Sequence, residues 1–600
     1  MTGLALASPL LAEQKPTVLV DVDHRTAISL NGDWHYIVDP YDSGYYDFRM
    51  QPRKDGYFLN QKPDESGKLV EYNFAASPTL KVPGDWNSQN PELFLYEGTL
   101  WYEKDFDYHR KPNTRAFLHV GAANYITHVW VNGKKVCDHE GGFTPFDCEV
   151  TDILQDGGNF VVIHVNDQRR RDGVPTLNTD WWNYGGLTRD VLLVEVPNQF
   201  VDDYTLQLQR GETSTIAGYV HVDGAGAGAH VSVSIPELKI KQDGITDAQG
   251  RAAISFEALG VQRWSPENPK LYDVEITAGV DRLHDSIGFR TIEVRGTDIL
   301  LNGKSIFLRG VSIHAEAPYR GGRAWSEQDC QTLLNWAKEL GVNYVRLAHY
   351  PHDERMTRLA DRMGIMVWSE VPVYWMIQWE NPETLANAKN QLQEMVRRDR
   401  NKASVILWSV ANETPNTAAR LKFLRTLIDT AHADDPTRPV TAALLVTTEP
   451  QTQNGMRLKM LDDPLGAYLD VLGCNEYIGW YEGPPELADH TEWQSKYNKP
   501  LIMSEFGGDA KAGLHSDATE RWTEEYQASI YQHQIAMLQR IPFLRGMSPW
   551  ILVDFRSPRR PLPGVQDFYN RKGLVSNQGE KKKAFFVLQE YYRSLAGSAK

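Results

Sequence analysis

Two buried strands that each end in a glutamate constrain the fold of this chain most strongly. Residues 405–410 are almost entirely apolar, which is typical of a parallel strand covered on both faces, and Asn412-Glu413 follow directly. Residues 501–504 repeat this pattern before Glu505. The two glutamates are 92 positions apart, or about three strand–helix units of an eight-stranded barrel. Because the carboxyl ends of barrel strands meet at one face, we expect the two carboxylates to face each other there.

A single glutamate after an apolar strand is usually only the start of a solvated loop, but a facing pair suits acid–base catalysis. Asn412-Glu413 and Glu505 resemble the acid/base and nucleophile motifs of glycoside hydrolase family 2, which includes β-galactosidases, β-glucuronidases and β-mannosidases. The resemblance extends over nearly the whole chain. It implies that Glu413 is the acid/base, that Glu505 is the nucleophile, and that Asn412 binds the 2-hydroxyl of the sugar.

The pattern of the chain changes twice, which predicts three domains. Residues 13–200 contain short alternating strands between turn signals and resemble the jelly-roll sugar-binding domain of the family. Residues 201–296 are again all-β, and their length suits an immunoglobulin-like β-sandwich. Residues 297–600 alternate strands with amphipathic helices, as in a catalytic (β/α)8 TIM barrel. A polar insertion at residues 41–75 has no regular period, so the sequence predicts no role for it.

Flanking residues locate individual elements of the barrel. Ser326 is expected to cap a helix that runs to Leu340 and ends at Gly341, and Asp353 is expected to begin the next helix. The closing helix is expected at residues 584–595. The predicted strands are the first at 305–314, the second at 343–349, the third at 366–370, the fourth at 405–413, the seventh at 501–505 and the last at 547–554.

Composition excludes several classes of partner. The formal net charge is −15 and the chain has no basic tract, which disfavours nucleic-acid binding. No apolar run approaches the length of a membrane span. The four cysteines lack metal-ligand spacing, and the expected mechanism needs neither a metal nor an organic cofactor. Cys137 and Cys148 could pair across a hairpin, but free thiols are the favoured interpretation.

The first residues resemble the end of a secretory signal peptide. Residues 4–12 are apolar and rich in alanine, and Glu13 would begin the mature chain. The basic segment that normally opens such a peptide is missing, so a disordered terminus is the alternative. The favoured interpretation is a periplasmic or secreted protein, with a cytoplasmic location as the alternative.

Polar residues at other strand ends are expected to support the catalytic pair. Arg346 and His349 close the second strand, where an arginine can hydrogen-bond the nucleophile and keep it ionised; a structural ion pair is the alternative. The resemblance also assigns a supporting role to His314. In the family a glutamate directly follows this histidine, whereas here Glu316 lies two positions on, so the sequence assigns it no role.

Further residues are expected to bind the sugar. By resemblance, Asp180 reaches the barrel mouth from the first domain, and Tyr477 and Tyr481 border the sugar. Trp550, in the predicted last strand, is also expected in the site. The alternatives are an aspartate that caps a turn and aromatic side chains that only pack beneath a loop.

The most discriminating motif is Asn570-x-Lys572, which follows the predicted last strand. An amide and an ammonium group two residues apart can both bind one carboxylate, which selects a uronic acid over a neutral hexose. The family's β-glucuronidases carry an Asn-x-Lys motif at this place. Many of them also have an arginine four residues before the asparagine, where this chain has Gln566. Arg571 is one candidate to replace it, and the motif does not settle the configuration at C4.

These residues predict an exo-acting retaining β-glucuronidase whose partner is a carbohydrate with a terminal uronic acid. Retention requires the two carboxyl groups to lie about 5–5.5 Å apart. Glu413 must start protonated, so its pKa should be raised by Glu505 and by burial. A β-galacturonidase or β-galactosidase of the same family is the first alternative, and an inactive carbohydrate-binding protein is the second. The sequence leaves open whether the chain forms a homo-oligomer.

Overall fold

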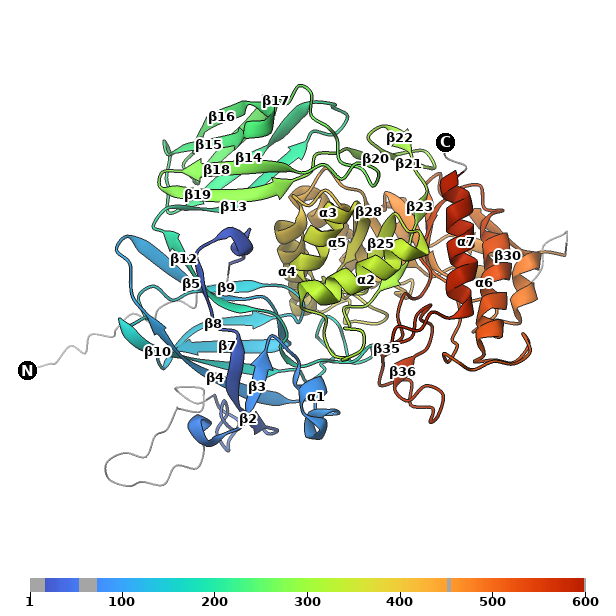
Figure 1. Ribbon diagram of the computed structural model, residues 1–600, viewed down its shortest axis with the longest axis horizontal. Helices are drawn as coiled ribbons and strands as arrows, with labels where there is room; N and C mark the ends of the chain where they lie inside the picture. The colour runs from blue at the N-terminus through green and yellow to red at the C-terminus, as the bar shows by residue number, and fades with distance from the viewer. Residues whose placement is uncertain (1–16, 53–72, 450–454, 598–600) are drawn as a thin grey trace, which may run out of the picture.

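The computed structural model describes residues 17–52, 73–449 and 455–597. Two β-rich units lie at one side of the molecule, in blue and green, and a larger unit of strands and helices lies at the other, in yellow to red (Figure 1). The signal-like residues 4–12 and residues 53–72 of the polar insertion fall outside the described residues. No helix in the described part is both long enough and apolar enough to cross a membrane.

The first unit is a jelly roll of two antiparallel sheets. Apolar side chains that alternate along the strands meet between the sheets and include Trp34, Leu118 and Ile163. One sheet has the order β1 (Ala27–Ser29), β12 (Val191–Pro197), β5 (Thr114–Val120) and β9 (Phe146–Glu149). The other has the order β3 (Thr79–Val82), β2 (Gly32–Asp39), β4 (Thr99–Tyr108), β10 (Gly157–Asn166), β7 (Ile126–Val131) and β8 (Lys134–Glu140).

A disulfide joins Cys137 and Cys148 in this unit, so the free-thiol interpretation was wrong. Cys137 lies on β8 and Cys148 on β9, which are edge strands of the two different sheets. Their Cα atoms are 5.8 Å apart, a distance that a disulfide spans. Sequence alone did not show that the two sheets bring these edges together. The remaining cysteines, Cys330 and Cys474, are free and buried.

The second unit is an immunoglobulin-like sandwich. Its strands alternate buried and exposed residues, most regularly in β19 (Asp281–Ile287), so that one face of each sheet contributes to a shared core. The three-stranded sheet has the order β13 (Phe200–Leu208), β14 (Thr215–Asp223) and β17 (Arg251–Glu257). The four-stranded sheet has the order β16 (Ile240–Ile245), β15 (His230–Ile235), β18 (Tyr272–Ala278) and β19.

The third unit is a closed barrel of parallel strands. The first barrel strand is split into β23 and β24; β23 pairs with β34, and β24 pairs with β25, which closes the ring. The predicted fourth and seventh strands are therefore confirmed as β27 and β33. In chain order the strands are β23 (Leu308–Arg309), β24 (Ser312–Ile313), β25 (Tyr344–Leu347), β26 (Met366–Glu370), β27 (Val405–Asn412), β28 (Val440–Leu444), β31 (Val471–Asn475), β33 (Leu501–Glu505) and β34 (Leu544–Met547).

Helices surround this ring, and the two whose caps the sequence predicts begin after those caps. Ser326 forms a capping box with Asp329 at the start of α2 (Glu327–Leu340), and Gly341 ends that helix at a φ of 98°. Asp353 caps α3 (Glu354–Met363). The other long helices are α4 (Pro382–Asp399), α5 (Ala418–Asp434), α6 (Glu524–Leu538) and the closing helix α7 (Lys583–Gly597). A short helix, α1 (Trp86–Gln89), belongs to the jelly roll.

Two predicted strands differ from the structure. The first is interrupted at Gly310, where the chain lies so close to Tyr344 that a Cβ would come within 2.1 Å of its ring. The predicted last strand at 547–554 is wrong because β34 ends at Met547. Pro549, which has no N–H to donate to a ladder, follows. The chain then stays between its two neighbours through isolated hydrogen bonds, from the N–H of Trp550 to Phe506 and from the N–H of Leu552 to Ser312. Trp550 in this segment lines the catalytic cavity.

Smaller sheets complete the fold. β20 (Ile292–Arg295), β21 (Asp298–Leu301) and β22 (Lys304–Ser305) link the sandwich to the barrel. β29 (Thr447–Glu449), β30 (Arg457–Leu461) and β32 (Thr491–Ser495) form a separate sheet. Two pairs of short strands remain, β6 (Ala123–Asn124) with β11 (Gly186–Leu187), and β35 (Phe555–Arg556) with β36 (Tyr569–Asn570).

Candidate active site

Glu413 and Glu505 lie at the carboxyl ends of β27 and β33 and line one cavity of about 310 Å³. Glu413 follows the last residue of its strand with a φ of 48°, so the chain turns sharply at this position. The predicted pair is thus brought together at the mouth of the barrel. The residues that line the cavity are Asp180, His349, Tyr374, Trp375, Glu413, Tyr477, Tyr481, Glu505, Trp550, Arg559, Arg560, Asn570 and Lys572.

Hydrogen-bond donors hold both carboxylate oxygens of Glu505. Arg346 Nη1 donates to Glu505 Oε1 at 2.7 Å, and the hydroxyl of Tyr477 donates to Oε2 at 2.6 Å. Burial and the charge of Glu505 hold the pKa of Tyr477 well above its usual value, so this hydroxyl keeps its proton. His349 Nε2 lies 3.7 Å from Oε1. Both oxygens are thus aligned by donors, which suits a nucleophile.

The surroundings of Glu413 favour the protonated acid. Burial, followed by repulsion from Glu505, raises the pKa of Glu413 to about 7. Trp375 Nε1 contacts Oε2 at 2.8 Å, and Asn475 Nδ2 contacts Oε1 at 2.9 Å, which fixes the orientation of the group. The raised pKa of Glu413 is what a general acid requires.

Arg346, near the end of β25, binds residues at the ends of three other strands, β26, β27 and β33. Besides Glu505, its guanidinium donates to Asn412 Oδ1 at 2.8 Å and to Glu370 Oε1 at 3.0 Å. Burial alone would raise the pKa of Glu370, but the charge of Arg346 and the hydrogen bond to His349 lower it to about 2. The predicted contact between Arg346 and the nucleophile and the alternative structural ion pair are therefore both present.

His349 and Trp550 form an aromatic layer beside Glu505. The ring of His349 stacks on Trp550 at 4.7 Å, and its Nδ1 lies 2.8 Å from Glu370 Oε1. His314 packs edge-on against the ring of Trp550, with the ring centres 5.1 Å apart. The Nδ1 atom of His314 lies 3.1 Å from the Tyr350 hydroxyl. His314 therefore does not line the catalytic cavity, and its expected supporting role is at most indirect.

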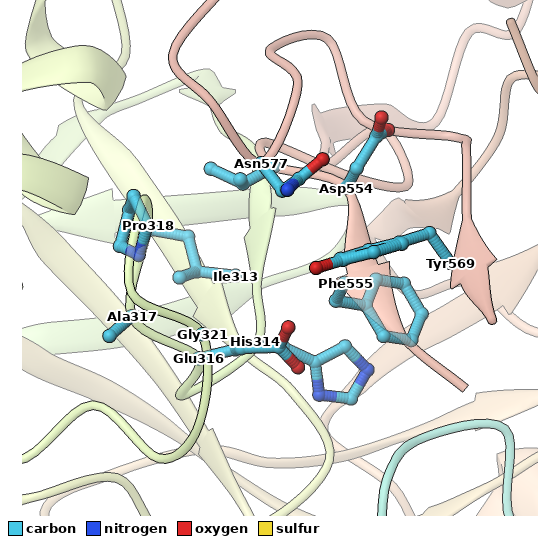
Figure 2. A pocket seen from close by; sticks show the side chains of 11 residues that line it. Ile313, His314, Glu316, Ala317, Pro318, Gly321, Asp554, Phe555, Tyr569 and Asn577 are labelled. Atoms are coloured by element: carbon cyan, nitrogen blue, oxygen red, sulfur yellow. The ribbon is translucent and has the colours of Figure 1, made fainter. Parts of the chain in front are cut away.

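Figure 2 shows a neighbouring pocket that His314 shares with Glu316. The carboxyl oxygens of Glu316 accept the backbone N–H of Arg556 at 3.0 and 3.1 Å. Burial raises the pKa of Glu316 to about 7. Tyr569 and Phe555 also line this pocket. Through Arg556, Glu316 contacts the backbone of the segment that leads to Arg560. Glu316 is not among the residues that line the catalytic cavity.

Asn570 and Lys572 lie in the catalytic cavity, as the Asn-x-Lys motif predicts. Lys572 Nζ contacts Asp509 Oδ2 at 2.6 Å and donates to the Tyr481 hydroxyl at 2.9 Å. The side chain of Lys572 is only 1% exposed. Burial alone would lower its pKa, but the charge of Asp509 raises it, so Lys572 is a buried cation. Asn570 Nδ2 donates to Asp180 Oδ2 at 3.2 Å.

Asp180 reaches this part of the cavity from the jelly roll. The adjacent Trp181 packs against Tyr374 at 4.9 Å and anchors the loop to the barrel. Ser557 Oγ donates to Asp180 Oδ1 at 2.6 Å, and Arg560 forms an ion pair with the same carboxylate. Asp180 is therefore held by the barrel and does not merely cap a turn in its own loop.

Arg560, and not Arg571, is the arginine that lies in the cavity with Asn570. Arg560 lines the cavity and also donates to the Tyr481 hydroxyl at 3.1 Å. Arg571 is directed elsewhere, to Asp554 Oδ2 at 3.3 Å and Asn577 Oδ1 at 3.1 Å, so the hypothesis that it replaces the missing arginine was wrong. Arg560 lies ten positions before Asn570, where no motif marks it.

Three family models match the chain in succession. They are the sugar binding domain of glycosyl hydrolases family 2 over residues 28–197, the glycosyl hydrolases family 2 model over 201–290, and the family 2 TIM barrel domain over 292–596. The chain belongs to glycosyl hydrolase family 2.

Relatives of this family 2 chain are similar over almost their whole length. A curated β-glucuronidase of Canis lupus familiaris is 32% identical over 99% of this chain and 94% of the relative. One from Paenibacillus borealis is 29% identical over 94% of this chain and 96% of the relative. The solved β-glucuronidase of Ruminococcus gnavus shares 25% identity, with a TM-score of 0.79 over 95% of this chain and 98% of that one.

Sequence reasoning missed several residues of this family 2 site. Glu370 ends a predicted strand and shows the same apolar run before a carboxylate as Glu413, so its pattern could have revealed it. Asp509 follows Glu505 by four positions and could have been considered as a counter-ion for Lys572. Trp375 and Arg560 lie in irregular segments, where spacing carries no signal.

Proposed function

We propose that this family 2 chain is an exo-acting retaining β-glucuronidase that removes terminal β-linked glucuronic acid from oligosaccharides or glycoconjugates. The observation that carries the proposal is the buried, charged Lys572 beside Asn570 in the same cavity as Glu413 and Glu505. A uronate carboxylate supplies the anion that such a pair can bind. The β-glucuronidase relatives support the same assignment.

In the first step, Glu505 attacks the anomeric carbon and forms a covalent ester. Glu413 transfers its proton to the glycosidic oxygen as the bond from that oxygen to the anomeric carbon breaks. A pKa of about 7 keeps Glu413 largely protonated at and below neutral pH. Arg346 and Tyr477 hold Glu505 in place for the attack.

In the second step, the ionised Glu413 removes a proton from water, and the water oxygen attacks the anomeric carbon and releases Glu505. The anomeric configuration is retained because two displacements occur. Asn412 is proposed to bind the 2-hydroxyl throughout. Its Oδ1 accepts from Arg346, while its buried Nδ2 has no hydrogen-bond partner within the described residues and can donate to the sugar.

Recognition of the sugar is proposed to involve the opposite end of the cavity. Lys572, Asn570 and Arg560 would donate to the uronate carboxylate, and Asp180 would accept a bond from a ring hydroxyl. The remaining aromatic residues, Tyr477, Tyr481 and Trp550, would border the pyranose. A neutral hexose would leave the buried charge of Lys572 without a substrate partner, which disfavours a β-galactosidase.

The test compares p-nitrophenyl β-glucuronide, β-galacturonide and β-galactoside for wild type, Lys572→Ala and the exposed control Lys241→Ala. We expect the glucuronide to be the best substrate and Lys572→Ala to lower its kcat/KM by roughly a hundredfold, as for loss of a hydrogen bond to a charged group. The control should match wild type. Equal or faster turnover of the galactoside would refute the role of Lys572 and leave the catalytic glutamates intact.

We also propose that the protein is exported to an oxidising compartment, periplasmic or extracellular. The Cys137–Cys148 disulfide supports this location because cytosolic thiols are normally kept reduced. The test is cell fractionation combined with thiol labelling before and after reduction. Activity confined to the cytosolic fraction, with all four cysteines labelled without reduction, would overturn the proposal.

A further inference from the structure

Arg559 lies at the mouth of the catalytic cavity and is exposed to solvent. Its guanidinium carbon lies 4.8 Å above the ring of Trp375. Its Nη1 donates to Asn178 Oδ1, in the loop that also carries Asp180. The side chain is thus held at the opening by the ring of Trp375 and by the neutral side-chain amide of Asn178.

Arg559 differs from the other cations of the cavity in its charge balance. Lys572 pairs with Asp509, and Arg560 pairs with Asp180. Within the described part of the chain, no carboxylate forms an ion pair with Arg559. Among the lysines and arginines that line the cavity, Arg559 is therefore the one without an ion pair to a described carboxylate.

The position of Arg559 relative to Glu413 indicates that Arg559 faces the leaving group of the substrate. Trp375, the ring beneath Arg559, donates its Nε1 to Glu413 Oε2 at 2.8 Å. Glu413 is the residue that protonates the glycosidic oxygen, so the groups beside it face the part of the substrate that departs. The uronate end is marked instead by Lys572 and Asn570.

We infer that the leaving group accepted by this site carries an anion, a sulfate or a carboxylate, on the unit next to the terminal glucuronic acid. The inference rests on the proposed function and narrows its substrate class to acidic oligosaccharides. A guanidinium has several N–H donors in one plane and binds either anion through paired hydrogen bonds. Its place over Trp375 already fixes its orientation before the substrate arrives.

The experiment uses three phenyl β-glucuronides that bear a 3-carbamoyl, a 3-carboxylate or a 3-sulfonate group. Wild type, Arg559→Gln, Arg559→Lys and the control Arg282→Gln are compared by kcat/KM at low and at high ionic strength. Arg282 lies on β19 of the sandwich and its side chain is 71% exposed. The readout is the ratio of each anionic substrate to the neutral one, because the chemistry of each leaving group is the same for every enzyme.

We expect wild type to favour the anionic substrates by about threefold to fivefold at low salt, the range of an exposed ion pair. This preference should shrink at high salt and fall to about one in Arg559→Gln. Arg559→Lys should retain part of it, and Arg282→Gln all of it. The larger response, sulfonate or carboxylate, identifies the anion.

Two failures are distinguishable. If none of the three glucuronides is hydrolysed, the proposed function fails and this inference fails with it. If all three are hydrolysed but the ratio in Arg559→Gln equals the wild-type ratio, the inference about the leaving group alone is overturned.

Discussion

The mouth of the barrel has two halves that are built differently. The catalytic half consists of residues at or just beyond strand ends: Arg346 at β25, Glu370 at β26, Asn412-Glu413 at β27 and Glu505 at β33. The half proposed to bind the sugar, called the recognition half, consists of Asp180 from the jelly roll and of Arg560, Asn570 and Lys572 from the segment after β34, where Asn570 ends the short strand β36. Strand ends are positioned by the hydrogen-bonded ring, whereas Asp180 and Arg560 are positioned by contacts between side chains. Asn570 and Lys572 are held by backbone contacts with Phe555 and Ile551, outside the ring. Under the proposed function, we therefore expect the barrel to fix the chemistry and the choice of sugar to depend on how separate segments meet.

The Asp180–Arg560 ion pair makes this dependence concrete. It joins the first domain to the last, because its partners are 380 positions apart in the sequence. Any change that separates the jelly roll from the barrel would therefore alter the recognition half and leave the strand ends unchanged. This comparison predicts effects of different size for substitutions in the two halves.

The largest effect is expected for Glu505→Gln in the catalytic half. The amide cannot form the glycosyl ester, so kcat/KM on p-nitrophenyl β-glucuronide should fall by at least about four powers of ten. The melting temperature should stay close to that of wild type or rise, because the substitution removes one buried carboxylate. Glu449→Gln, at an exposed position of β29, is the matched control. Near-wild-type hydrolysis by Glu505→Gln would exclude it as the nucleophile.

The next effect concerns the pH dependence of the same half. The free enzyme is active when Glu413 is protonated, and its pKa of about 7 places the loss of that proton near neutral pH. As pH rises through this value, kcat/KM should decline about tenfold per unit, or roughly a hundredfold by about pH 9. Initial rates from pH 5 to 9 test this. Glu413→Gln should lose this alkaline decline when assayed with an activated leaving group; persistence of the decline would assign it to another residue.

The two halves also differ in how far the sequence predicts them. Apolar runs before Glu413 and Glu505 located both glutamates, because burial on two faces constrains which residues a barrel strand can contain. The same rule places Glu370, which sequence reasoning left without a role. Lys572 was predicted only because its motif resembles one known in the family. Arg560 could not be predicted, because its place in the cavity follows from a loop that Asp180 holds across a domain boundary.

The disulfide and the split first strand were mispredicted for a similar reason. Cys137 and Cys148 become neighbours only when the edges of two sheets meet. The first strand is interrupted at Gly310, where the ring of Tyr344 packs against the backbone. Both depend on contacts between elements. Helix ends, by contrast, depend on local caps such as Ser326 and Gly341, and these were predicted correctly.

A smaller effect, of about tenfold, is expected for Arg560→Gln in the recognition half. Its loss removes one donor to the uronate and releases Asp180, so KM for the glucuronide should rise more than kcat falls. The ratio of glucuronide to galactoside turnover should decline with it. Arg571→Gln is the informative comparison, because that side chain contacts Asp554 and not the cavity. If Arg571→Gln lowered the ratio more than Arg560→Gln, the assignment of Arg560 to the uronate would be wrong.

The smallest effect on rate is expected for Glu316→Gln, which tests how the recognition half is held. The Glu316 carboxyl accepts the N–H of Arg556, and the carbonyl of Arg556 accepts the N–H of Trp182 at 3.0 Å. The backbone of this one residue therefore links the pocket of Figure 2 to the Asp180 loop. Glutamine can accept the same bond, so kcat/KM should change by no more than about twofold.

The pH dependence of stability should nevertheless change in Glu316→Gln. The pKa of Glu316 is raised from 4.5 to about 7 in the folded protein. Between these values the folded state keeps a proton that the unfolded state has lost, so this group's stabilising contribution is complete below about pH 4.5 and declines until about pH 7. Glutamine does not titrate, and the other groups are common to both proteins. The melting temperature of Glu316→Gln relative to wild type should therefore increase between about pH 5 and pH 8. If the difference in melting temperature between the two proteins stayed constant over this pH range, Glu316 would be ionised in the folded protein. The N–H of Arg556 would then stabilise a carboxylate and not a neutral acid.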